Sequence, residues 1–268
     1  MQSLPSNKQE KNIIPELLGD TGFCRDLGIR YPYLGGSMAK GISSVELSIA
    51  LGKAGMLGFF GAAGLPIEAV EAAIDQLAAS CVPFGCNLIH SPQEPDLEAS
   101  LAELYILKKV QLVEASAFLT LTLPLVRYRL HGIHRSADGS IVTPNRIIAK
   151  VSREELAEKF FSPAPEKLVA SLLHQGLITA EQAELAKQVP MAQDITAEAD
   201  SGGHTDNRPA LTLLPTIQSV AGRMQQQYGY PMQLRVGLGG GIGTPQAAAA
   251  AFSMGAAWIM VGSVHQAC

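Results

Sequence analysis

The chain has 268 residues, of which 47% are hydrophobic and 16% are charged, and its formal net charge is −4. The charged share lies well below the roughly 25% of an average soluble domain. It excludes a disordered chain, because disorder needs high charge and few large apolar side chains. Lys and Arg number 20 against 24 Asp and Glu. Because no basic stripe is present to neutralise a phosphate backbone, we expect no nucleic-acid partner.

Neither the cysteines nor the amino-terminal residues indicate a location outside the cytoplasm. The four cysteines form no Cys-x-x-Cys pair and no zinc-type cluster, so we expect reduced thiols and no metal site. Residues 1–15 are polar and lack the apolar segment of a secretory signal. Residues 247–264 carry no charge, but Gly255 splits them into an alanine-rich half and residues 258–261. A helix followed by a buried strand fits that split better than a membrane span.

In the first half of the chain, short apolar runs alternate with stretches of helical period. The predicted strands cover residues 31–35, 57–60, 83–89 and 111–115. The predicted helices between them cover residues 43–54, 66–79 and 96–109. Ser43 or Ser44 could cap the first of these helices, and Pro66 suits the first position of the second.

In the second half, the alternation resumes after a less regular region. Residues 118–130 predict a short helix broken by Pro124, and residues 137–140 predict the turn of a hairpin. The remaining predicted strands cover residues 146–151, 194–199, 234–238 and 258–261. Helical stretches are expected at residues 152–187, 209–228 and 245–254.

Eight strands that alternate with helices predict an α/β fold of the TIM (β/α)8 barrel type. We divide the chain into an N-terminal lead segment, 1–30, and a barrel, 31–268, with a helical insertion at 152–190 between strands five and six. The chain stops just after the eighth strand, without an eighth helix. We therefore expect a truncated barrel that lacks its final helix and C-terminal region, with apolar surface exposed on its first and eighth strands and with weakened closure.

A glycine-rich segment, residues 236–245, follows the seventh strand and precedes a helix. Backbone amides and the helix dipole can bind an anion there. The spacing fits neither a Rossmann fingerprint nor a Walker loop. The eighth strand also ends in glycine, at Gly262, and TIM barrels build a phosphate site after strands seven and eight. Tight turns that merely need glycine are the alternative.

The sixth strand ends in the sequence Glu198-Ala-Asp-Ser-Gly-Gly-His204. His204 would face the same mouth of the barrel as the glycine loops and could act as an acid or a base. A histidine that is simply hydrogen-bonded within a loop is the alternative. Lys150 ends the fifth strand, where it could place a cation against an anionic ring or phosphate. Asn87, at the end of the third strand, offers a donor and an acceptor, and Met38 offers an apolar contact.

Taken together, these segments resemble the PfaD-type trans-acting enoyl reductases of polyketide and polyunsaturated fatty acid synthases, within the wider nitronate monooxygenase-like group of FMN-binding TIM barrels. The resemblance rests on Gly35-Gly-Ser-Met38, Phe59-Phe-Gly-Ala-Ala-Gly-Leu65, Ile148-Ala-Lys-Val-Ser-Arg153, Glu198-Ala-Asp-Ser-Gly-Gly-His-Thr-Asp206, Gly239-Gly-Gly-Ile-Gly-Thr-Pro245 and Gly262-Ser263. Relatives usually carry asparagine where this chain has His265.

The resemblance implies FMN as cofactor, NADPH or NADH as reductant, and an enoyl thioester on an acyl carrier protein as substrate. It implies His204 as the residue that transfers a proton to the α-carbon and places Lys150 near the flavin ring. The other residues that it implies in FMN binding are Asn87, Gly202, Gly240, Gly241, Gly262, Ser263 and Val264, and we add Met38. A nitronate monooxygenase-like flavoenzyme and a non-catalytic remnant of either enzyme are the alternatives.

Overall fold

The computed structural model describes residues 14–201 and 205–267, in which eight parallel strands close into a barrel. Around the barrel the strands run β1, β2, β3, β4, β7, β8, β9, β10 and back to β1. Their bounds are Tyr33–Gly35 (β1), Leu57–Phe60 (β2), Phe84–Ile89 (β3), Leu112–Ser116 (β4), Arg146–Val151 (β7), Asp194–Glu198 (β8), Arg235–Gly239 (β9) and Ile259–Val261 (β10). The predicted TIM barrel is confirmed.

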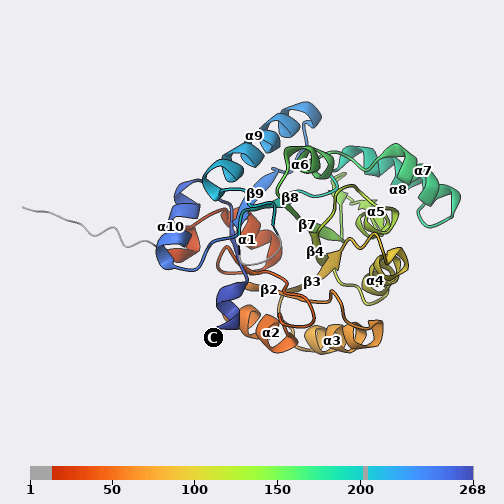
Figure 1. Cartoon of the computed structure of the whole chain (residues 1–268). Helices are drawn as coiled ribbons and strands as arrows, with labels where there is room; N and C mark the ends of the chain where they lie inside the picture. Colours follow the sequence, from red (N-terminus) through yellow and green to blue (C-terminus); the bar gives the residue numbers. More distant parts are fainter. Residues whose placement is uncertain (1–13, 202–204, 268) are drawn as a thin grey trace, which may run out of the picture.

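Helices form a ring around these strands (Figure 1). The ring consists of α2 (Val45–Lys53), α3 (Ile67–Ala79), α4 (Pro95–Leu107), α5 (Leu123–Leu130), α6 (Glu154–Phe161), α9 (Ala210–Tyr228) and α10 (Pro245–Ser253). The predicted insertion contributes α6 and two outlying helices, α7 (Glu166–His174) and α8 (Ala180–Leu185), followed by the 3-10 turn η2 (Ala186–Gln188). The predicted hairpin is present as β5 (His134–Arg135) and β6 (Ile141–Val142), outside the barrel.

The helices begin at their capping residues, and the structure differs from the sequence prediction at two prolines, Pro66 and Pro124. Ser44, not Ser43, caps α2, because its hydroxyl accepts a hydrogen bond from the Leu47 amide. Pro66 precedes α3 instead of opening it. Pro124 lies in the first turn of α5, where a missing amide hydrogen costs nothing, so it starts this helix and does not break it.

On the amino-terminal side of the barrel lies α1 (Thr21–Leu27), which follows the short turn η1 (Pro15–Leu17). The Phe23 ring stacks on the Trp258 ring at the base of the barrel, with centroids 4.1 Å apart. Both side chains are fully buried. A Cβ atom at Gly237 would lie 2.3 Å from the Trp258 ring, so only glycine leaves room for the indole there. Part of the lead segment therefore packs into the barrel.

An ion cluster built on the buried residues Arg235 and Asp194 lies beside this aromatic pair, and we call it the basal cluster. The Arg235 guanidinium makes two hydrogen bonds to the Asp194 carboxylate, of 2.6 and 3.1 Å, and a third of 2.8 Å to Asp26 on α1. It also lies 5.2 Å from the centroid of the Phe23 ring. Arg235 therefore ties α1 to the first residues of β8 and β9.

The barrel closes fully between its first and last strands. β1 pairs with β10 through Tyr33↔Ile259, Leu34↔Met260 and Gly35↔Val261. All three β10 residues are buried, and Leu34 is fully buried. The turn η3 (Ser263–Gln266) lies beside α2 (Figure 1). There His265 Nε2 is 2.9 Å from the Tyr33 hydroxyl. The expectation of exposed apolar strands and weakened closure is therefore wrong.

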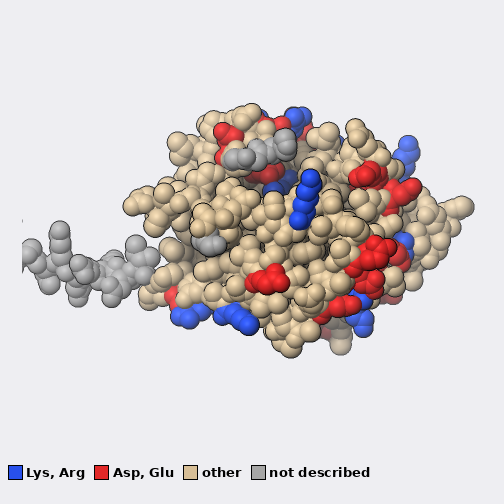
Figure 2. All heavy atoms as spheres, turned by 60° about the horizontal axis from the view of Figure 1, so that its bottom comes forward, with Lys and Arg blue, Asp and Glu red and all other residues tan. Residues whose placement is uncertain are grey.

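The face of the molecule in Figure 2 carries dispersed charge. On the face in Figure 2, Lys and Arg side chains are scattered among Asp and Glu without a continuous basic area. Within the described ranges, no helix is long and apolar enough to cross a bilayer, and residues 247–261 are divided between α10 and β10.

Candidate functional site

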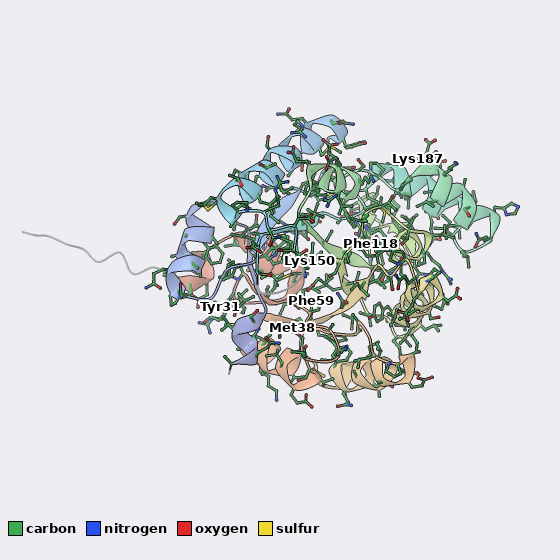
Figure 3. The ribbon with its side chains drawn as sticks, viewed as in Figure 1. Tyr31, Met38, Phe59, Phe118, Lys150 and Lys187 are labelled. Atoms are coloured by element: carbon green, nitrogen blue, oxygen red, sulfur yellow. The ribbon has the colours of Figure 1, made fainter. Side chains whose placement is uncertain are left out.

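A cavity of about 760 Å³ opens at the carboxyl ends of the barrel strands. Residues at or just after the ends of all eight strands line it. The predicted site residues that line it are Met38, Asn87, Lys150, Gly240, Gly241, Gly262, Ser263 and Val264. Gly202 and His204 lie outside the described residues. Figure 3 places Lys150 near the centre of the barrel and Met38 on the side of α2, whereas Lys187 lies far away on the insertion.

The loop between β9 and α10 gives the cavity one wall of bare backbone. Gly240 and Gly241 have φ angles of 97° and 70°, in the left-handed region that favours glycine. A Cβ atom at Gly240 would lie 2.3 Å from the Ala199 carbonyl oxygen, so a side chain would displace the turn. The Thr244 hydroxyl caps α10 by accepting from the Ala247 amide. The loop therefore leads directly to a helix N-terminus, which favours an anion.

The loop after β1 provides a second wall. The Ser43 hydroxyl accepts from the Met38 amide at 2.9 Å and donates to the Gly36 carbonyl at 2.8 Å. A Cβ atom at Gly61 would lie 1.8 Å from the Met38 carbonyl oxygen, so the two backbones are in direct contact. Met38 is therefore held against the cavity by the loops after both β1 and β2.

Lys150 carries the positive charge of the cavity. Its Nζ atom lies 2.9 Å from Glu198 Oε1 and 3.4 Å from Glu114 Oε1. Burial alone would lower the pKa of Lys150, but the two carboxylates outweigh burial and raise it above its ordinary value. The side chain therefore stays charged at neutral pH, where it can bind an electron-rich group but is a poor proton donor. We call these three residues the mouth cluster.

Glu114 was missed in the sequence, although it is the best-connected group of the mouth cluster. Its side chain is fully buried and accepts hydrogen bonds from the amide and hydroxyl of Ser37 and from the Ser116 hydroxyl. The Asn87 amide nitrogen donates to the same Ser116 hydroxyl at 3.1 Å. A glutamate inside the otherwise apolar run 112–115 was the available signal, because a barrel interior admits a carboxylate only with partners.

Asp206, which follows β8 in the chain, is held by residues of the loop after β7. Its carboxylate accepts from Arg153 Nε at 2.9 Å and from the Ser152 hydroxyl at 2.5 Å. The hydrogen bonds from Arg153 and Ser152 lower the pKa of Asp206 to about 2. Because both partners directly follow β7, the ion pair joins the loops after the fifth and sixth barrel strands.

Comparison with known proteins gives close relatives over almost the entire chain, although no family model matches it. The chain is 54% identical, over 94% of its residues, to one of the polyunsaturated fatty acid synthase subunits of Thraustochytrium sp.. It is 44% identical, over 97% of its residues, to the polyketide biosynthesis protein PksE of Bacillus subtilis. It spans only 17% and 35% of the lengths of these two proteins.

A solved structure is also similar to this chain in sequence and in fold. The enoyl reductase domain of MlnA, from the macrolactin biosynthesis cluster of Bacillus amyloliquefaciens, is 42% identical and superposes with a TM-score of 0.90. The match covers 94% of this chain and 57% of that one. These comparisons confirm the resemblance to the PfaD-type trans-acting enoyl reductases that the sequence motifs indicate.

Proposed function

We propose that the chain is the FMN-binding barrel of an enoyl reductase, which acts in trans on enoyl thioesters carried by acyl carrier protein. Its partner would be a polyketide or polyunsaturated fatty acid synthase in the cytoplasm, and NADPH or NADH would be its reductant. The observation that carries the proposal is the cavity at the carboxyl ends of the strands, which combines two glycine loops with a partly buried cation. It occurs in a chain 42% identical to a crystallised enoyl reductase domain.

The residues of the cavity fit FMN in size and in chemistry. A volume of about 760 Å³ lies within the usual range of cofactor pockets. The bare amides of Gly240 and Gly241, next to the N-terminus of α10, suit a phosphate. Lys150 and Asn87 suit the polar edge of a ring, and Met38 suits its apolar face. Bound FMN would supply hydride transfer to the β-carbon of the enoyl thioester.

The chain's own residues would bind and orient the reactants. The glycine loops would hold the phosphate, and the loop at Met38 would form one side of the ring site. Lys150 would hold positive charge beside the ring, and its raised pKa makes it a poor acid at neutral pH. We assign the proton for the α-carbon to His204, in the segment that ends at the Asp206–Arg153 ion pair.

The first test is the absorbance spectrum of the purified chain, with mass analysis of any cofactor released on denaturation. Bound FMN supports the proposal, and a folded chain without affinity for FMN favours a non-catalytic remnant. The second test is NAD(P)H-dependent reduction of a short enoyl thioester, without oxygen. His204→Ala should slow this reduction while FMN stays bound, and undiminished turnover would remove the assigned role. Oxygen consumption with an alkyl nitronate, and no enoyl reduction, would favour a nitronate-oxidising enzyme.

A further inference from the structure

The two carboxylates beside Lys150 differ sharply in how they are held. Glu114 is fully buried and accepts from the Ser37 amide at 3.0 Å, from the Ser37 hydroxyl at 2.8 Å and from the Ser116 hydroxyl at 3.2 Å. Its hydrogen bonds therefore come from the loop after β1 and from β4, and its ion pair comes from β7. Moving this carboxylate would leave one buried and two partly buried donors without an acceptor, which is costly.

Glu198 is held much more weakly. Its side chain is one quarter exposed and lines the cavity at the end of β8. Within the part of the chain that the structure describes, its side chain is paired with Lys150 alone, at 2.9 Å. A carboxylate with access to water can leave an ion pair at little cost, because water replaces the lost contact.

With both carboxylates ionised and Lys150 protonated, the mouth cluster carries one net negative charge. That charge opposes the binding of an anionic or electron-rich ligand, although the glycine loops beside it favour one. The conflict disappears if one carboxylate moves away when the ligand arrives. The difference in burial shows which of the two can move.

We propose that Lys150 has one permanent counter-ion, Glu114, and one exchangeable counter-ion, Glu198, which gives up the ammonium group to the polar edge of the bound cofactor ring. Glu114 is then a positioning residue, which sets the place of Lys150 and of the Ser37 loop together. The inference rests on the proposed function, because it takes FMN as the ligand.

The first experiment needs no ligand. The Lys150 side-chain ammonium is observed by 15N NMR near neutral pH and is assigned with Lys150→Met. Because partial burial and a fixed partner slow its exchange with water, we expect a resolved signal in the wild type. The signal should persist in Glu198→Gln and disappear in Glu114→Gln, two variants that each remove one charge at nearly constant volume. Persistence in Glu114→Gln together with loss in Glu198→Gln would overturn the assignment of the two roles.

The second experiment titrates FMN into cofactor-free protein and follows flavin fluorescence. Glu198→Gln should bind FMN roughly two- to fivefold more tightly, as expected when a partly exposed competing charge is removed. Glu114→Gln should bind about tenfold more weakly. Riboflavin, which lacks the phosphate, should give the same ratios, because the exchange takes place at the ring. Weaker FMN binding by Glu198→Gln would overturn the exchange.

The two experiments separate the two proposals. A folded wild type that binds neither FMN nor riboflavin would overturn the proposed function and, with it, the exchange at Glu198. The NMR signal would still decide whether Glu114 is the permanent counter-ion. Circular dichroism of each variant checks the fold. If Glu114→Gln does not fold, Ser37→Ala is used instead. It removes one hydroxyl donor to Glu114, so the carboxylate is held less firmly, and FMN binding should again become weaker.

Discussion

The barrel contains an ion cluster at each end, and the two differ in what surrounds them. At the amino-terminal end, α1 covers the basal cluster of Arg235, Asp194 and Asp26. At the carboxyl end, the mouth cluster of Lys150, Glu114 and Glu198 borders an open cavity. In both, a cation from one strand bridges two carboxylates. The central pair of the basal cluster, Arg235 and Asp194, is almost fully buried and can only hold elements together, whereas Lys150 and Glu198 line the cavity, where a ligand can replace one of them.

The largest expected effect comes from removing the cation of the basal cluster. Arg235→Met leaves Asp194 buried without its partner, which costs about 3–5 kcal/mol of unfolding free energy. Denaturant unfolding measures this loss. The double variant Arg235→Met/Asp194→Leu should recover most of it, because no unpaired charge remains. A double variant as unstable as the single one would show that the cluster does more than compensate buried charge.

Removing the cation of the mouth cluster should lower the unfolding free energy less than Arg235→Met does. It should weaken FMN binding more. After Lys150→Met, Glu198 can turn to water, and Glu114 keeps its three hydrogen bonds. We therefore expect a loss of about 2 kcal/mol in denaturant unfolding, smaller than at Arg235. FMN affinity should fall at least about tenfold. If both losses match those of Arg235→Met, the distinction between the two ends of the barrel is wrong.

A smaller effect is expected in the loop after β9. Gly240→Ala places a side chain at a φ of 97° and against the Ala199 carbonyl, so the turn must shift. We expect a stability loss of about 1–2 kcal/mol and weaker binding of FMN. Because the loop is assigned to the phosphate, riboflavin binding should change less than FMN binding. Equal losses for both ligands would contradict that assignment.

The smallest effect is expected at the end of α1, on the amino-terminal side of the barrel. Gly28 ends α1 at a φ of 67°, and a Cβ atom there would meet no atom within 4 Å. Gly28→Ala should therefore cost about 1 kcal/mol, from backbone conformation alone. Thermal unfolding measures the change, and FMN affinity should stay at the wild-type value. A change in FMN affinity would mean that the two ends of the barrel are coupled.

The order of strands and helices could be predicted because each barrel strand is a short apolar run between breakers. Leu57–Phe60 and Arg146–Val151 have the predicted bounds, and the other barrel strands shift by one or two residues at one or both ends. By contrast, α1 was missed, because its seven residues include only two buried side chains, too few to give a helical period. Its caps, Asp20 and Gly28, were the available signal.

The candidate site was predicted only where residues follow strand ends. Lys150, Asn87 and the glycine loops were found in this way, and the structure brings them to one cavity. Glu114 was not found, because its role depends on Ser37 and Lys150, which lie far from it in sequence. The pattern of one strand cannot show which distant donors satisfy a buried carboxylate.

The contacts of α1 and β1 with the last barrel strand also affect how the chain folds during its synthesis. Phe23 packs on Trp258, and Leu34 pairs with Met260, so residues near the two ends of the sequence are neighbours in space. On the ribosome, the first segments emerge long before their partners are synthesised. Such distant contacts slow folding. The edge of β1 and the ring of Phe23 therefore lack these partners until translation reaches β10, and unpaired edges and exposed apolar surface promote aggregation.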